Sequence, residues 1–226
     1  MTKRLLRTSV AGPAPGVKAD AVTAAGPATP DRLLEAGAAA FAERGFHATT
    51  TRDIANRAGL SPAGLYVHYP SKGALLAHLS LAGHQGALEL VQESLSGPSP
   101  APERLHAMVA AFVTWHAEHH VVARVVQYEL RSLDEQTRVE VYALRRQMED
   151  LVQQVIAEGV RSGALQVDIL RPAARAVLSL AVDVARWFDP LGRDSAQEIG
   201  RIYADLALQM LGTGPSAQHP PPRSST

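Results

Sequence analysis

Apolar residues recur every three or four positions through most of the chain from about residue 29 to residue 212. This spacing puts apolar side chains on one face of an α-helix, and no stretch has the sustained alternation, bounded by turn signals, of a half-buried strand. The pattern therefore predicts an all-α fold. We expect about nine helices, the first ending at Gly45, over 29–44, 52–58, 61–67, 71–95, 102–118, 121–131, 134–161, 172–188 and 195–211.

Residues 49–72 contain the most informative part of this pattern, two very short helices around a glycine. Thr51 is placed to cap the first helix and Ser61 the second, which has Pro62 at its first position. Gly59 between them favours the positive φ that a sharp turn needs. Two short helices joined in this way form a helix-turn-helix, whose second helix enters the major groove of duplex DNA.

The residues that follow the turn suit this role. Residues 62–64 have short side chains, so the backbone can approach base edges, and Ser71 and Lys72 begin a further helix where N–H groups and an ammonium can hold a phosphate. The alternative is an ordinary helical hairpin in which Tyr66 and Tyr69 are packing aromatics. The pattern alone leaves both open.

A series of short motifs runs through about residues 30–76, namely Phe41-Ala42-Glu43-Arg44-Gly45-Phe46, Thr49-Thr50, Asp53-Ile54-Ala55, Ala58-Gly59-Leu60-Ser61, Leu65-Tyr66-Val67-His68-Tyr69 and Ser71-Lys72. In these motifs the chain resembles the N-terminal domain of the TetR family of bacterial repressors. The resemblance implies a DNA-binding domain at 29–76 and a ligand-binding and dimerisation domain at 77–212. The arm at 1–28 and the tail at 213–226 have compositions that favour flexibility.

The resemblance also assigns DNA contacts. It implies that phosphates are held by Thr50, Thr51, Tyr66, Tyr69 and Lys72, and that bases or the nearby backbone face Arg52, Ser61, Ala63, Gly64 and His68. Many relatives have Gly and then Thr or Ala where this chain has Ala63 and Gly64, and Gly73 stands where the family has an acid. We therefore expect sequence readout to depend on Arg52 and on DNA shape.

The last two helices predict a dimer. Apolar residues of 195–211 form one stripe, whereas those of 173–188 surround the helix nearly completely, so that helix should be buried on both sides. One side can face a partner chain, and two such helices from each chain make a four-helix interface. The alternative is a monomer whose core uses both faces.

The family resemblance implies that the second domain binds a small-molecule effector. Pockets in helical bundles are mostly apolar with a few polar anchors, and the candidate lining residues are Phe112, Trp115, His116, Tyr128, Arg131, Met148, Arg186 and Trp187. Arg186 interrupts an apolar helix, so it must pair with an acid such as Asp183 or Asp189, reach solvent or hold an anion.

Three segments, 123–130, 144–146 and 182–188, resemble the TetR branch that represses actinobacterial cholesterol and steroid-ring catabolism and senses acyl-CoA thioesters. The resemblance implies that the acyl cavity is lined by Trp115, Tyr128 and Trp187, and that CoA phosphates or the thioester meet Arg124, Arg145, Arg146 or Arg186. A hydrophobic effector without CoA, regulating an efflux or other catabolic operon, is the alternative.

Charge is balanced overall but not along the chain. Basic and acidic residues both number 22, yet residues 1–80 hold 9 and 5 and the remainder 13 and 17. A modestly basic first third suits phosphate binding, whereas a neutral chain disfavours a non-specific architectural DNA binder. The basic arm at 1–28 either enters an adjacent minor groove or stays a solvated tail.

Other classes of function find little support. The chain has no phosphate-binding loop, dinucleotide-binding glycine motif, nucleophile elbow or zinc-protease motif, so we expect no enzyme and no cofactor. It has no cysteine, membrane-length apolar run or signal peptide, which favours the cytoplasm. The spacing of His116, His119 and His120 can bind zinc or nickel, but a solvated or core-edge cluster is the preferred interpretation.

Overall fold

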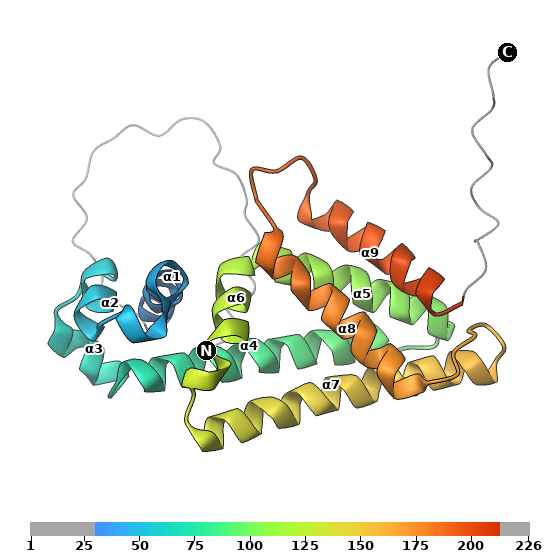
Figure 1. The fold of residues 1–226 in the computed structure, drawn as a ribbon, viewed down its shortest axis with the longest axis horizontal. Coiled ribbons are helices and arrows are strands. Elements are labelled where there is room, and N and C mark those ends of the chain that lie inside the picture. The colour runs from blue at the N-terminus through green and yellow to red at the C-terminus, as the bar shows by residue number, and fades with distance from the viewer. Residues whose placement is uncertain (1–29, 213–226) are drawn as a thin grey trace, which may run out of the picture. The chain divides into compact units, whose positions relative to one another are not determined.

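The computed structural model describes residues 30–212, and the arm and the tail lie outside them. Within this range there are nine α-helices, one short 3-10 helix and no strand, which confirms the predicted all-α class (Figure 1). None of these helices is both long and apolar enough to cross a membrane. The helices are α1 Pro30–Ala48, α2 Thr51–Arg57, α3 Pro62–His68, α4 Lys72–Leu95, α5 Ala101–Glu118, α6 His120–Tyr128, the 3-10 helix η2 Leu130–Ser132, α7 Glu135–Arg161, α8 Leu170–Trp187 and α9 Ala196–Met210.

One local expectation needs correction. The first short helix is capped by Thr50 and not by Thr51, which is its first helical residue. The regular helix of α1 is interrupted at Gly45, as expected, because this residue has a φ of 77° and a ψ of 163°. Glycine tolerates this positive φ, and beyond the kink a short further stretch of helix extends α1 to Ala48.

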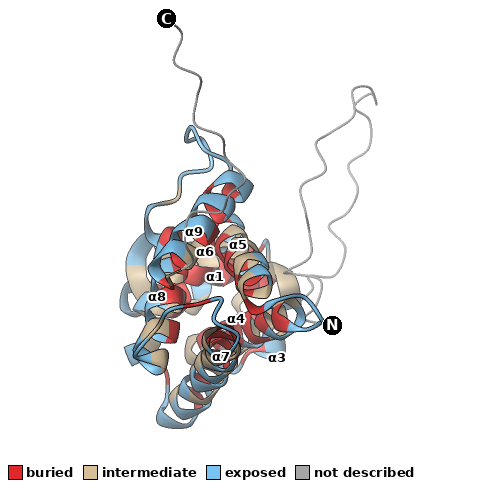
Figure 2. Ribbon diagram, turned by 90° about the vertical axis from the view of Figure 1, so that its right-hand side faces the viewer, coloured by how far each residue is buried: buried red, intermediate tan, exposed pale blue. Residues whose placement is uncertain are grey.

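The described residues form two compact units. The first unit contains residues 30–86 and 121–142, and the second contains 87–120 and 143–212. Residues from α6 and α7 join the core of the first unit, where Val125 and Val141 are buried with residues of α1 to α4. Buried residues line the inward sides of the helices (Figure 2).

In the second unit, α9 packs closely on α5. The contact passes over Gly200, where an added Cβ would lie 2.4 Å from Thr114 Oγ1 and 2.6 Å from the carbonyl oxygen of Ala110. The neighbouring small residues Ala196 and Ala204 are also buried. Small side chains on this side of α9 let the two backbones approach.

The outer sides of α8 and α9 remain exposed in the single chain. Although 173–188 was expected to be buried on both sides, Leu180 and Trp187 are 39 % and 43 % exposed. On α9, the residues Ile202, Leu206 and Met210 follow one another at intervals of four and are 40 %, 47 % and 48 % exposed. The unit's own core therefore uses only one face of each helix.

Candidate nucleic-acid interface

A small apolar core holds the two short helices against α1. Leu33 of α1, Ile54 of α2 and Leu65 of α3 have no exposed surface. Gly59, in the turn between α2 and α3, has a φ of 71°, which only glycine adopts without strain. The segment therefore has the helix-turn-helix geometry that its sequence predicted, with one side of each short helix packed and the other side free.

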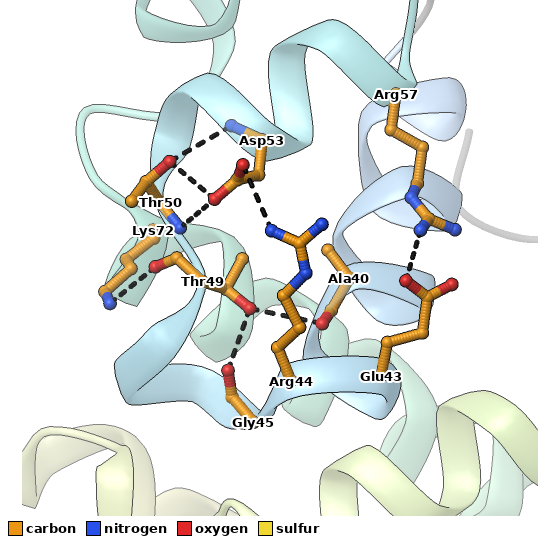
Figure 3. A network of polar contacts seen from close by, with 9 residues as sticks. All are labelled: Ala40, Glu43, Arg44, Gly45, Thr49, Thr50, Asp53, Arg57 and Lys72. Carbon is orange, nitrogen blue, oxygen red and sulfur yellow. Dashed lines mark hydrogen bonds and ion pairs between the residues drawn. The ribbon is translucent and has the colours of Figure 1, made fainter.

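The start of α2 is fixed by a capping box (Figure 3). The Asp53 backbone N–H donates to Thr50 Oγ1 at 3.1 Å, and the Thr50 backbone N–H donates to Asp53 Oδ2 at 2.9 Å. The hydrogen bonds from Thr50 hold the pKa of Asp53 below its ordinary value, and the Arg44 guanidinium, 3.3 Å away, adds to this effect. Thr50, predicted to grip a phosphate, thus has an established structural role as the helix cap.

The start of α3 has a similar cap. Ser61 Oγ accepts a hydrogen bond from the Gly64 backbone N–H at 3.2 Å, and Pro62 is the first helical residue. Helices α2 and α3 are also joined through their side chains, because Thr51 Oγ1 and the Tyr66 hydroxyl lie 3.1 Å apart. These contacts fix the second helix relative to the first before any partner is bound.

Lys72, predicted to grip a phosphate, lies at the end of α1 in this structure. Its ammonium donates to the carbonyl oxygens of Phe46, His47 and Thr49 at 2.8, 3.1 and 2.8 Å and lies 4.6 Å from the centre of the Phe46 ring. An ammonium has three donors, and the three carbonyls occupy all of them. From the other side, Glu129 Oε1 accepts from the Phe46 backbone N–H at 2.9 Å.

Tyr69, also predicted to hold a phosphate, is a core residue in this structure. It is 6 % exposed, and its ring meets the ring of His78 edge-on at 5.7 Å between centroids. Burial, and to a smaller extent the nearby Asp31 carboxylate, raises the pKa of its hydroxyl. The reason is the end of α3, where the extended backbone of Tyr69 directs its ring inward.

The other predicted contacts lie at the surface of the helix-turn-helix. Arg52, Ala63 and His68 are exposed, and Tyr66 is 52 % exposed. Val67, which was not among the predicted contacts, is 79 % exposed on α3. The signal available was its position four residues after Ala63, which places both on one face of the helix.

The predicted effector residues belong to both units. Phe112, His116 and Met148 are in the buried core of the second unit, with Trp115 packed partly against it. The first unit contains the others from α6 and η2, namely Arg124, Tyr128 and Arg131. Tyr128 is 63 % exposed and Arg131 is also exposed.

Arg186 pairs with Asp183 and also reaches solvent, which are two of the three alternatives considered for it. Its Nε and Nη2 donate to the two carboxylate oxygens of Asp183, each at 2.9 Å, and the pair is exposed. The neighbouring Trp187 ring lies 6.1 Å from the ring of Tyr203 on α9. Arg145, on α7, is half-buried in the same unit.

The three histidines considered for a metal each use one ring nitrogen on the backbone. Nδ1 of His116, His119 and His120 lies 2.8, 2.9 and 2.9 Å from the carbonyl oxygens of Phe112, Trp115 and Ala117. Among the residues described, no three His, Cys, Asp or Glu side chains are grouped as metal ligands would be.

Two family models match the chain. The model of bacterial regulatory proteins of the tetR family matches residues 33–79, and a model of tetracyclin repressor-like C-terminal domains matches residues 98–211. The chain belongs to the TetR family. TetR proteins are DNA-binding transcriptional regulators and not a class of enzyme, so the helix-turn-helix described above is the DNA-binding element of this chain.

Known TetR proteins match most of its length. The transcriptional repressor KstR2 of Mycobacterium tuberculosis is 31 % identical over 181 residues, which cover 78 % of this chain and 89 % of KstR2. The structure of KstR2, described as a ketosteroid transcriptional regulator, has a TM-score of 0.75 at 27 % identity and covers 80 % of this chain and 94 % of its own.

Two further structures share the fold. A regulatory protein of the tetR family from Rhodococcus RHA1 has a TM-score of 0.78 at 36 % identity, covering 82 % of this chain and 98 % of its own. AibR in complex with isovaleryl coenzyme A and operator DNA has a TM-score of 0.70 at 22 % identity, covering 80 % and 97 %. At that identity AibR is similar in fold alone.

Proposed function

We propose that this TetR protein is a repressor that binds a palindromic operator as a dimer and is released from it by a small molecule. The observation that carries the DNA-binding part is the capped helix-turn-helix, whose outer face presents Arg52, Ala63, Tyr66 and His68 to solvent. Thr51 and Ser61 complete this face. The dimer and the effector site of this proposal are assigned to the second unit.

The dimer is supported by the exposed apolar side chains of α8 and α9. Five large apolar residues on two helices of the second unit are between 39 % and 48 % exposed, namely Leu180, Trp187, Ile202, Leu206 and Met210. Leaving such surfaces in water is costly, at roughly 25 cal/mol for each Å². A second copy applied in twofold symmetry would cover them and form a four-helix interface.

For the effector we propose an acyl-CoA thioester of lipid or steroid catabolism. KstR2, similar over most of the chain, is described as a ketosteroid regulator, and AibR, similar in fold, holds isovaleryl coenzyme A. The apolar residues Phe112, Trp115 and Met148 suit an acyl chain, and Arg145 lies in the same unit. A hydrophobic effector without CoA is the second candidate, favoured by the core position of Phe112 and Met148.

One two-step experiment tests these proposals. Purified protein selects bound duplexes from a random DNA pool, and the enriched site is then used to measure release by acyl-CoAs of increasing size, free coenzyme A and the matching free acids. We expect a palindromic site and release by an acyl-CoA at concentrations where coenzyme A has no effect. Failure to enrich any site would refute the repressor, whereas release by the free acids alone would favour the second candidate.

The half-site spacing provides a further check. Two reading heads related by twofold symmetry meet successive major grooves about 34–36 Å apart, which is one helical turn. The effector can shift the protein off DNA only by as much as its affinities for the bound and released states differ. Because the DNA of a bacterial cell lies in the cytoplasm, we propose that the protein acts there.

A further inference from the structure

Val67 is the most exposed large apolar residue of the helix-turn-helix. It is 79 % exposed, whereas Leu65, two residues earlier on the same helix, has no exposed surface. Val67 belongs to neither apolar core of the described residues. A valine in this position adds nothing to the packing of the unit, and its isopropyl group is available to a partner.

The face of α3 around Val67 has few polar atoms. Ala63 and Gly64 precede it by four and three residues and therefore lie on the same side of the helix. Ser61 Oγ is already engaged by the Gly64 backbone N–H, and the Tyr66 hydroxyl lies 3.1 Å from Thr51 Oγ1. The surface formed by Ala63, Gly64 and Val67 therefore consists of methyl groups and bare backbone, with the exposed His68 beside it.

Among the base edges of the major groove, the C5-methyl of thymine is the apolar group that such a surface can recognise. All four bases also present hydrogen-bond donors or acceptors there, including O4 of thymine, and a valine cannot satisfy them, so the C5-methyl alone distinguishes thymine for an apolar side chain. We propose that Val67 contacts the methyl group of a thymine in each half-site and thereby selects that base. The inference rests on the proposed DNA-binding function and adds the identity of one base to it.

The size of the effect follows from the apolar contact. Removal of one methyl group from water is worth about a fourfold change in affinity. Since each dimer contacts two half-sites, loss of both methyl groups should weaken binding about fifteenfold if the half-sites are independent. Loss of the isopropyl group of Val67 should have an effect of similar size on thymine-containing DNA.

The test replaces thymine by deoxyuridine, which lacks only the C5-methyl. Each thymine pair of the selected operator is substituted in turn in both half-sites, and the dissociation constant is measured by fluorescence anisotropy with the wild-type protein and with Val67→Ala. We expect one position at which deoxyuridine weakens wild-type binding about fifteenfold. At that position Val67→Ala should bind thymine and deoxyuridine DNA equally.

The control is Val139→Ala, because Val139 is also an exposed valine of the first unit, 57 % exposed, but lies on α7. It should keep the full response to deoxyuridine. The proposal is overturned if no position responds, or if the responding position stays equally sensitive in Val67→Ala. If no duplex is enriched at all, the DNA-binding function fails first and this inference fails with it.

Discussion

Replacement of Lys72 by Met should destabilise the first unit, because Lys72 closes the end of α1. The substitution keeps the length of the side chain but removes three hydrogen bonds to carbonyl oxygens, of 2.8, 3.1 and 2.8 Å, and the charge above the Phe46 ring. Lys72 is only half-buried, so water replaces part of what is lost. At about 0.5–1 kcal/mol for each bond, the expected loss is about 2 kcal/mol.

Thermal unfolding followed by circular dichroism measures this loss. For a chain of this size, about 2 kcal/mol corresponds to a fall in Tm of about 4–8 °C. Arg52→Met is the matched control, because Arg52 is exposed in the same unit, and its Tm should stay within about 1 °C of wild type.

The same variant separates capping from the phosphate contact that the family resemblance implied. A lysine that served only to grip a phosphate would leave Tm unchanged. Its loss from both half-sites of a dimer would reduce the slope of log Kobs against log salt by about 1.8, or about 0.9 for each contact. That pair of results for Lys72→Met would refute the capping role.

Three further predictions concern other parts of the chain. Gly200→Ala should destabilise the second unit by about 1–3 kcal/mol in urea unfolding, because the new Cβ would lie 2.6 Å from the carbonyl oxygen of Ala110. The control is Gly83→Ala, which should be neutral or stabilising because the nearest neighbour of its Cβ would lie 3.9 Å away. Equal effects would contradict the close approach of α5 and α9. The hydrogen bonds from Thr50 lower the pKa of Asp53, so the Asp53 carboxylate should stabilise the fold above the ordinary pKa of an aspartate and lose this effect as the pH falls through the lowered pKa. The difference in urea midpoint between wild type and Asp53→Asn should therefore disappear in acid. A difference that persisted unchanged would contradict the lowered pKa as its cause. Leu206→Glu should give a monomer in sedimentation at micromolar concentration and lose operator binding, whereas Val139→Glu should remain dimeric; a dimeric Leu206→Glu would place the interface elsewhere.

Much of the DNA-binding element can be predicted from local sequence. Its helices are short and their signals lie within a few residues: Ser61 before Pro62 at the start of α3, and Gly59 at the one position in the turn that needs a positive φ. Helix caps, glycine turns and apolar spacing involve only residues close together in the sequence, so they can be recognised without the tertiary structure. Even here the cap of α2 was displaced by one residue, because three consecutive threonines offer similar side chains.

The tertiary structure decided what each side chain does. The family resemblance placed Lys72 and Tyr69 among the DNA contacts. Only the tertiary structure shows that the bend at Gly45 brings three carbonyls to the Lys72 ammonium and that the Tyr69 ring is buried after the end of α3. The apolar spacing of the sequence did not single out Val67, and only the packing of α3 shows that its side chain is exposed. Helix boundaries are set by interactions between residues close in sequence, whereas exposure and hydrogen-bond partners depend on segments far apart in sequence, which no local pattern specifies.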